Sequence, residues 1–148
     1  MPAARAAFRY LLTLFLVGVA VQFFLAGLGV FKAQHATDRG TLGEDQFGNF
    51  FDPHVANGNA LLILGVVVFL AALIGRMGRR WVLIALALPI LVELQFVFAN
   101  TGPSWFRAIH VLNAFVIAGL AGSQTGIAWQ EARTGTEAPP EPHGQPAS

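Results

Sequence analysis

The stretch His-Val-Ala-Asn at residues 54–57 begins one long apolar run of this chain, and His-Val-Leu-Asn at residues 110–113 begins another. The chain has 148 residues, of which 55% are hydrophobic and 11% are charged. Because soluble domains carry about 25% charged residues, this composition predicts a membrane protein, and the length favours one domain. The repeated motif therefore places a histidine at the start of each of two hydrophobic segments.

Four apolar segments are long enough to cross a bilayer as helices. A hydrocarbon core about 30 Å thick requires roughly 20 apolar residues per helix. The segments cover about residues 8–31, 50–74, 81–99 and 105–129. They predict an all-α membrane fold, in which residues 1–133 form a four-helix up-down transmembrane bundle. Residues 134–148 are rich in Pro, Gly and Glu, and this composition predicts a disordered cytoplasmic tail.

Basic residues are distributed unevenly between the two ends of the predicted bundle. The end of the bundle opposite the two termini holds fewer Lys and Arg residues, and its predicted loop, residues 32–49, also contains acidic residues. Because cytoplasmic loops carry an excess of Lys and Arg, both termini are expected on the cytoplasmic side of a bacterial plasma membrane. The basic residues on the expected cytoplasmic side are Arg5, Arg9, Arg76, Arg79, Arg80 and Arg133.

An internal repeat relates the two halves of the chain. Residues 22–29, QFFLAGLG, and residues 95–102, QFVFANTG, are identical at four of eight positions. Each of these segments is followed by a helix that carries His-Val-x-Asn. The two hairpins therefore predict a pseudo-twofold repeat, and internal symmetry in membrane bundles commonly places a site between the halves. Chance similarity between two apolar segments is the alternative interpretation.

The repeat predicts that both histidines lie at the same depth. Asn49 and Ser104 are expected to cap the helices that carry His54 and His110. In an up-down bundle the second and fourth helices are diagonal to each other. We therefore expect the two imidazoles to face each other across the core.

Two facing imidazoles could serve as the axial ligands of a heme. Neutral histidine is a common metal ligand, and ionisable residues inside membrane spans are usually functional. The favoured hypothesis is a heme b whose iron is bound by His54 and His110, with Arg107 near the propionates. Asn57 and Asn113 are expected to hydrogen-bond the imidazoles or each other. Two strong ligands leave no open iron position, which favours electron transfer over oxygen chemistry.

Other interpretations of the same residues stay open. Polar side chains also join helices in membranes, so the motif could belong to a non-catalytic subunit of a larger complex. Glu93 is expected to be buried, where it could relay protons or pair with Gln22 or Asn57. A small transporter or proton channel would use Glu93 and the histidines. Zinc is less well supported, because closed zinc sites need four ligands and His35 would have to fold inward from its loop.

Composition narrows the classes of partner and reaction. The chain has no cysteine, which excludes disulfides and thiolate sites. The net charge of +1, without a basic patch, indicates no nucleic-acid partner. No catalytic motif is present, so any enzymatic activity would be that of a membrane oxidoreductase. The expected partners are the lipid bilayer and a quinone or redox protein.

Histidines at the outer ends of the second and fourth helices of a four-helix unit resemble one half of heme A synthase. That resemblance covers nearly all of residues 8–129, and it implies that His54 and His110 hold a heme. The chain departs from that family in having one bundle. It also has Asp52 two positions before its histidine, where the family has a Glu three before, and Val55 where the family has an Arg. These departures favour heme binding over heme modification. The chain is also similar to small, functionally uncharacterised four-helix membrane proteins of actinobacteria.

Overall fold

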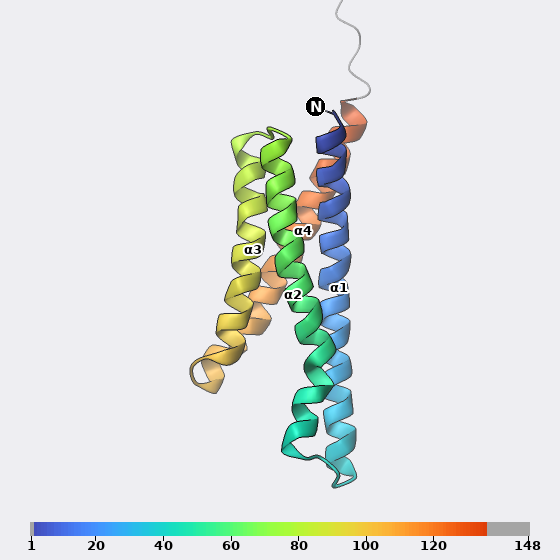
Figure 1. Ribbon diagram of the computed structural model, residues 1–148, viewed down its shortest axis with the longest axis vertical. Coiled ribbons are helices and arrows are strands. Elements are labelled where there is room, and N and C mark those ends of the chain that lie inside the picture. The colour runs from blue at the N-terminus through green and yellow to red at the C-terminus, as the bar shows by residue number, and fades with distance from the viewer. Residues whose placement is uncertain (1, 136–148) are drawn as a thin grey trace, which may run out of the picture.

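The computed structural model describes residues 2–135 and consists of four long helices in an up-down arrangement (Figure 1). Each helix is long and apolar enough to span a membrane. The all-α four-helix fold is therefore confirmed, and the chain is a multi-pass membrane protein. The predicted tail at residues 136–148 lies outside the described residues. The helices are α1 (Pro2–Asp38), α2 (Glu44–Ile74), α3 (Arg79–Asn100) and α4 (Ser104–Thr134).

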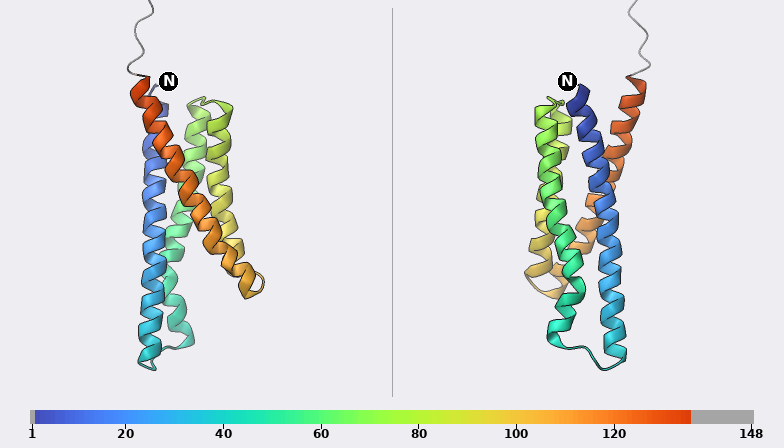
Figure 2. Two further views of the ribbon diagram at one scale, coloured as in Figure 1. Left: turned by 180° about the vertical axis from the view of Figure 1, so that it is seen from behind. Right: turned by 45° about the vertical axis from the view of Figure 1, so that its right-hand side comes forward.

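The helices form a closed cycle of neighbours. α1 packs against α2 and α4, and α3 packs against the same two helices. Figure 2 shows α4 crossing the bundle at an angle, in front of the other helices in the left view, so that its last turns lie near the start of α1. α2 and α4 are therefore the diagonal pair, as predicted, and side chains on their inner faces meet across the core.

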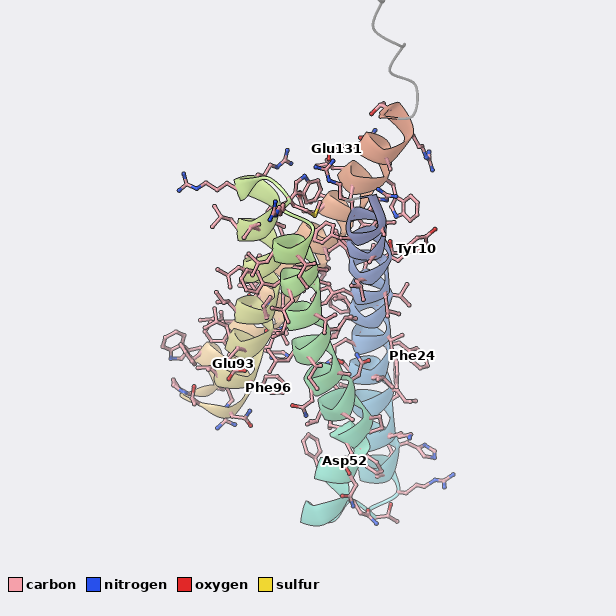
Figure 3. The ribbon with its side chains drawn as sticks, turned by 45° about the horizontal axis from the view of Figure 1, so that its top comes forward. Tyr10, Phe24, Asp52, Glu93, Phe96 and Glu131 are labelled. Atoms are coloured by element: carbon pink, nitrogen blue, oxygen red, sulfur yellow. The ribbon has the colours of Figure 1, made fainter. Side chains whose placement is uncertain are left out.

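The apolar core lies in the half of the bundle that contains the chain's first residues. Its largest fully buried side chains are Phe8, Phe15, Leu12, Leu88 and Val68. Other large apolar side chains point outward along the spans, among them Leu14, Phe24 and Phe115 (Phe24 is labelled in Figure 3). In a bilayer, lipid covers such side chains, so their exposure agrees with the membrane assignment.

The predicted loop at residues 32–49 is wrong, because both flanking helices continue into it. α1 runs to Asp38 and α2 starts at Glu44, which leaves a connection of only a few residues. Ala33 and Ala36 are buried, so helix pairing extends beyond the apolar segments. Gly40, with a φ of +65°, makes the turn in a left-handed conformation that glycine adopts without strain. The hairpin of α1 and α2 therefore projects past that of α3 and α4 (Figure 1).

The predicted helix caps are also corrected. Asn49 lies within α2, whose N-cap is Gly43, and Ser104 is the first residue of α4, whose N-cap is Pro103. Neither N-cap makes a side-chain capping bond. His54 is therefore deeper inside its helix than expected, because α2 begins six residues before the predicted start at residue 50.

Candidate functional site

A cavity of about 340 Å³ lies between the four helices at the level of the two histidines. All four helices contribute to its wall, and most of the wall is apolar. The lining residues are Val19, Gln22, Phe23, Ala26, His54, Val55, Gly58, Leu61, Val92, Gln95, Phe96, Ala99, Asn100, His110, Val111, Ala114 and Ile117.

The residues that line the cavity occur in pairs related by the sequence repeat. Each lining residue of α1 has a counterpart on α3 at the spacing of Gln22 and Gln95, and each of α2 has one on α4 at the spacing of His54 and His110. Sixteen of the seventeen lining residues form eight such pairs, and Asn100 alone has no partner in the wall. Chance similarity between apolar segments would not place counterparts around one cavity. The cavity therefore lies on the pseudo-twofold axis.

The two imidazoles face each other across the cavity, as the repeat predicts. The ring centroids of His54 and His110 lie 6.1 Å apart, and the ring planes are inclined by 53°. Both side chains are partly buried. Two nitrogen heterocycles from diagonal helices thus come together with no acidic side chain in the cavity wall.

Backbone carbonyls fix the tautomer of both imidazoles. Nδ1 of His54 lies 3.2 Å from the carbonyl oxygen of Gln22, and Nδ1 of His110 lies 3.1 Å from that of Gln95. Because a carbonyl oxygen only accepts hydrogen bonds, Nδ1 carries the hydrogen in each ring. Each Nε2 therefore keeps its lone pair, which is the state in which imidazole binds metals.

Asn57 and Asn113 also make equivalent contacts, but not the predicted ones. Asn57 donates to the carbonyl oxygen of Gly18 at 3.0 Å, and Asn113 donates to that of Leu91 at 2.8 Å. Each acceptor lies one helical turn before the glutamine of its helix. The prediction that these amides bond the imidazoles or each other is wrong, because they face the neighbouring helix rather than the cavity. They join α2 to α1 and α4 to α3.

The two glutamines break the symmetry of the site. The Gln22 amide group donates to Nε2 of His54 at 3.2 Å and to its backbone carbonyl at 3.0 Å, while its oxygen accepts from Asn57 at 2.6 Å. The amide oxygen of Gln95 is buried and has no hydrogen-bond partner within residues 2–135. In the same part of the chain, no hydrogen bond to Nε2 of His110 is found. In the half of the site that contains Gln22 and His54, the polar side chains therefore bond to one another. In the half that contains Gln95 and His110, the amide oxygen and Nε2 are left available to a ligand.

Glu93 and Arg107 do not reach the cavity. Glu93 is exposed on the outer face of α3 (Figure 3), so the prediction that it is buried near Gln22 or Asn57 is wrong. Glu93 is also absent from the residues that line the cavity, although Val92 before it lies in the wall. Arg107 is exposed one turn before His110 and lies outside the cavity wall.

His35 is exposed on α1, which forms helix where a loop was predicted. Among residues 2–135, no group of three or more His, Cys, Asp or Glu side chains could hold a metal ion. A zinc site built from His35, His54 and His110 is therefore not assembled in the described part of the chain.

The comparisons with known proteins yield one family. Residues 22–102 match the model of a family of unknown function, DUF6220, and because this is more than half of the chain, the chain belongs to that family. The match begins at Gln22 and contains His54 and Gln95, whereas His110 lies beyond it. No curated protein and no solved structure matches the chain.

Proposed function

We propose that this member of the DUF6220 family binds heme b between His54 and His110 and transfers electrons. The observation that carries the proposal is the pair of imidazoles facing each other across an apolar cavity, each with its Nδ1 hydrogen held by a backbone carbonyl. A hydrogen bond from the second ring nitrogen is the usual way in which a metal-binding histidine is oriented. His110 is thus prepared to offer its Nε2 to a metal, and His54 would do so once its Nε2 is released from the Gln22 amide.

The distance between the rings supports a shared metal. Each metal–nitrogen bond of about 2.0 Å, together with roughly 1 Å from the nitrogen to the ring centroid, would set two axial imidazoles about 6 Å apart. The observed separation of the centroids is 6.1 Å. A larger separation would require the helices to move together before both rings could bind, and a smaller one would leave no room for the metal.

The wall of the cavity suits a flat, largely apolar ligand. Its volume of about 340 Å³ lies at the lower end of the range of ~300–1,000 Å³ found for small-molecule sites, so a heme would extend beyond it. Gly58 on α2 and its counterpart Ala114 on α4 lie one turn after each histidine. Both residues are small, so they leave space in the cavity beside the imidazoles. A macrocycle with approximate twofold symmetry matches a cavity whose wall is itself paired by a twofold axis.

Bound in this way, heme would supply one-electron transfer, because two axial histidines leave no iron position for oxygen. The chain's own residues hold the group, exclude water and set its surroundings. The distribution of Lys and Arg supports cytoplasmic termini and a heme layer toward the outer side of the plasma membrane. A quinone or a redox protein on that side is the proposed electron partner. Arg107, which is exposed one turn before His110 and outside the cavity wall, would meet the propionates where they leave the cavity.

Optical titration of the detergent-purified protein with hemin tests the proposal. We expect one heme per chain, and on reduction with dithionite a red-shifted Soret band and split visible bands. His54→Ala and His110→Ala should each change the spectrum and weaken binding, while His35→Ala, at an exposed histidine, should behave as the parent protein. The proposal fails if the parent protein binds no heme, or if both cavity variants keep the parent's spectrum and affinity.

A non-catalytic membrane subunit is the second candidate, and the network of Gln22, His54 and Asn57 favours it. This network joins α1 to α2 without any ligand. The alternative predicts that the protein binds no heme and co-purifies with a partner protein. The hemin titration therefore distinguishes the two candidates directly.

A further inference from the structure

A second cavity lies at the opposite end of the bundle, where the first turns of α1 meet the last turns of α4 and the turn between α2 and α3. Its volume is about 120 Å³, several times the ~10–15 Å³ that a single ordered water requires. Its wall holds Arg5, Arg9, Met77, Trp81, Ala128, Glu131 and Ala132. Nothing in the proposed heme function uses this cavity.

Two arginines on one face of α1 line the cavity. Arg5 and Arg9 are four residues apart, which places them one above the other on the helix. Nε of Arg9 is buried and has no hydrogen-bond partner within residues 2–135. A buried guanidinium N–H without a hydrogen-bond acceptor is unfavourable. The Nε–H group of Arg9 is therefore suited to donate to an acceptor that comes from outside the chain.

Aromatic side chains place this cavity at the depth of lipid headgroups. The Arg9 guanidinium lies 5.5 Å from the centre of the Trp129 ring, and the Arg80 guanidinium lies 5.7 Å from that of Trp81. Tyr10 packs edge-on against Trp129 with ring centroids 5.3 Å apart. Trp and Tyr concentrate at membrane–water interfaces, so the guanidinium groups lie where phospholipid phosphates are found.

We propose that this cavity binds the phosphate of an anionic phospholipid headgroup through Arg5 and Arg9. Guanidinium groups bind phosphate oxygens through paired N–H donors. Basic pockets between transmembrane helices at the cytoplasmic surface are suited to anionic headgroups. Arg80 adds positive charge beside Trp81. Glu131 disfavours this binding, because its exposed carboxylate lies at the cavity wall and repels phosphate.

Native mass spectrometry of the delipidated, detergent-purified protein tests this site. The probes are phosphatidylglycerol, phosphatidylethanolamine and inorganic phosphate, each titrated separately and in competition. We expect phosphatidylglycerol to bind best, Arg5→Gln and Arg9→Gln to weaken its binding several-fold, and Glu131→Gln to strengthen it. Arg39→Gln removes an exposed arginine at the opposite end of the bundle and should leave binding unchanged.

Three results would overturn the inference. Equal binding by the parent protein and both arginine variants would show that the cavity does not hold the phosphate. Equal binding of phosphatidylethanolamine would remove the preference for an anionic lipid, and displacement of lipid by inorganic phosphate at matching concentration would identify free phosphate as the ligand. Arg5 is exposed, so Arg5→Gln tests the site even if Arg9→Gln does not fold.

Discussion

The side-chain amide of Gln22 donates to Nε2 of His54 at 3.2 Å, occupying the ring nitrogen that a metal would need. At the equivalent place in the other half, the amide oxygen of Gln95 has no partner within residues 2–135. The two histidines are thus matched in tautomer and depth but not in availability. A ligand entering the cavity would meet a free nitrogen on His110 and a bonded one on His54.

Replacing Gln22 should separate stability from ligand binding. Gln22→Ala removes two donated hydrogen bonds and one accepted bond. At about 0.6 kcal/mol for each such bond in a membrane bundle, the free energy of unfolding should fall by ~1–2 kcal/mol. The freed Nε2 of His54 should at the same time bind heme more tightly. Unfolding in detergent followed by circular dichroism measures the first effect, and hemin titration measures the second.

The repeat provides the matched control for this variant. The Gln95 side chain makes no hydrogen bond to any residue in 2–135, so Gln95→Ala should change the free energy of unfolding by less than ~0.5 kcal/mol. An equal loss of stability in both variants would mean that the Gln22 network contributes nothing particular to the fold.

The two histidine variants should differ in heme affinity. In His54→Ala, the free Nε2 of His110 still binds iron, whereas in His110→Ala the remaining nitrogen competes with the Gln22 amide. We therefore expect His110→Ala to lose more heme affinity than His54→Ala, by several-fold, in an absorbance titration. Combining His110→Ala with Gln22→Ala should restore part of the loss. The reverse order of affinities would show that Gln22 does not limit access to His54.

A larger side chain at Gly58 should close the heme cavity without unfolding the bundle. A Cβ atom there would lie 3.3 Å from Nε2 of Gln22 and 3.3 Å from Cζ of Phe96. Both neighbours are side chains that can shift, so Gly58→Val should fill the wall and reduce bound heme several-fold at unchanged helicity. Gly119→Val is the control, because a Cβ at Gly119 meets nothing within 4 Å. If Gly58→Val takes up heme as well as this control, the cavity is not the binding site.

The sequence repeat and the hydropathy pattern were enough to predict most of the fold and the two facing histidines at the centre of the site. Four apolar segments are enough to predict four spans, and the copies of His-Val-x-Asn predict the facing of His54 and His110. Helix ends were less predictable, because hydropathy marks only the part of a helix that lies in lipid. α1 continues seven residues past Phe31, to Asp38, through polar sequence that still packs against α2.

The orientation of single side chains was harder to predict. Helices that are apolar on all sides do not reveal which face is buried, and for that reason the sequence did not show that Glu93 points outward. The difference between Gln22 and Gln95 was equally hidden, since identical residues at equivalent positions differ here only in their contacts. The basic cavity formed by Arg5 and Arg9 could have been suspected from their spacing of four residues beside Trp81 and Trp129, but only the fold brings these elements together.

Close packing of α2 on α3 should make Gly65 intolerant of even one added methyl group. A Cβ atom at Gly65 would lie 3.2 Å from the backbone nitrogen of Pro89, which cannot move without displacing α3. Glycine to alanine in an open helix position stabilises by up to ~1 kcal/mol, whereas overpacking costs about 1–3 kcal/mol. Gly65→Ala should therefore lower the free energy of unfolding. Gly126→Ala, where a Cβ meets nothing within 4 Å, should raise it slightly. Unfolding of both variants in the same detergent checks the two signs, and a stabilised Gly65→Ala would mean that α2 and α3 are less closely packed than described.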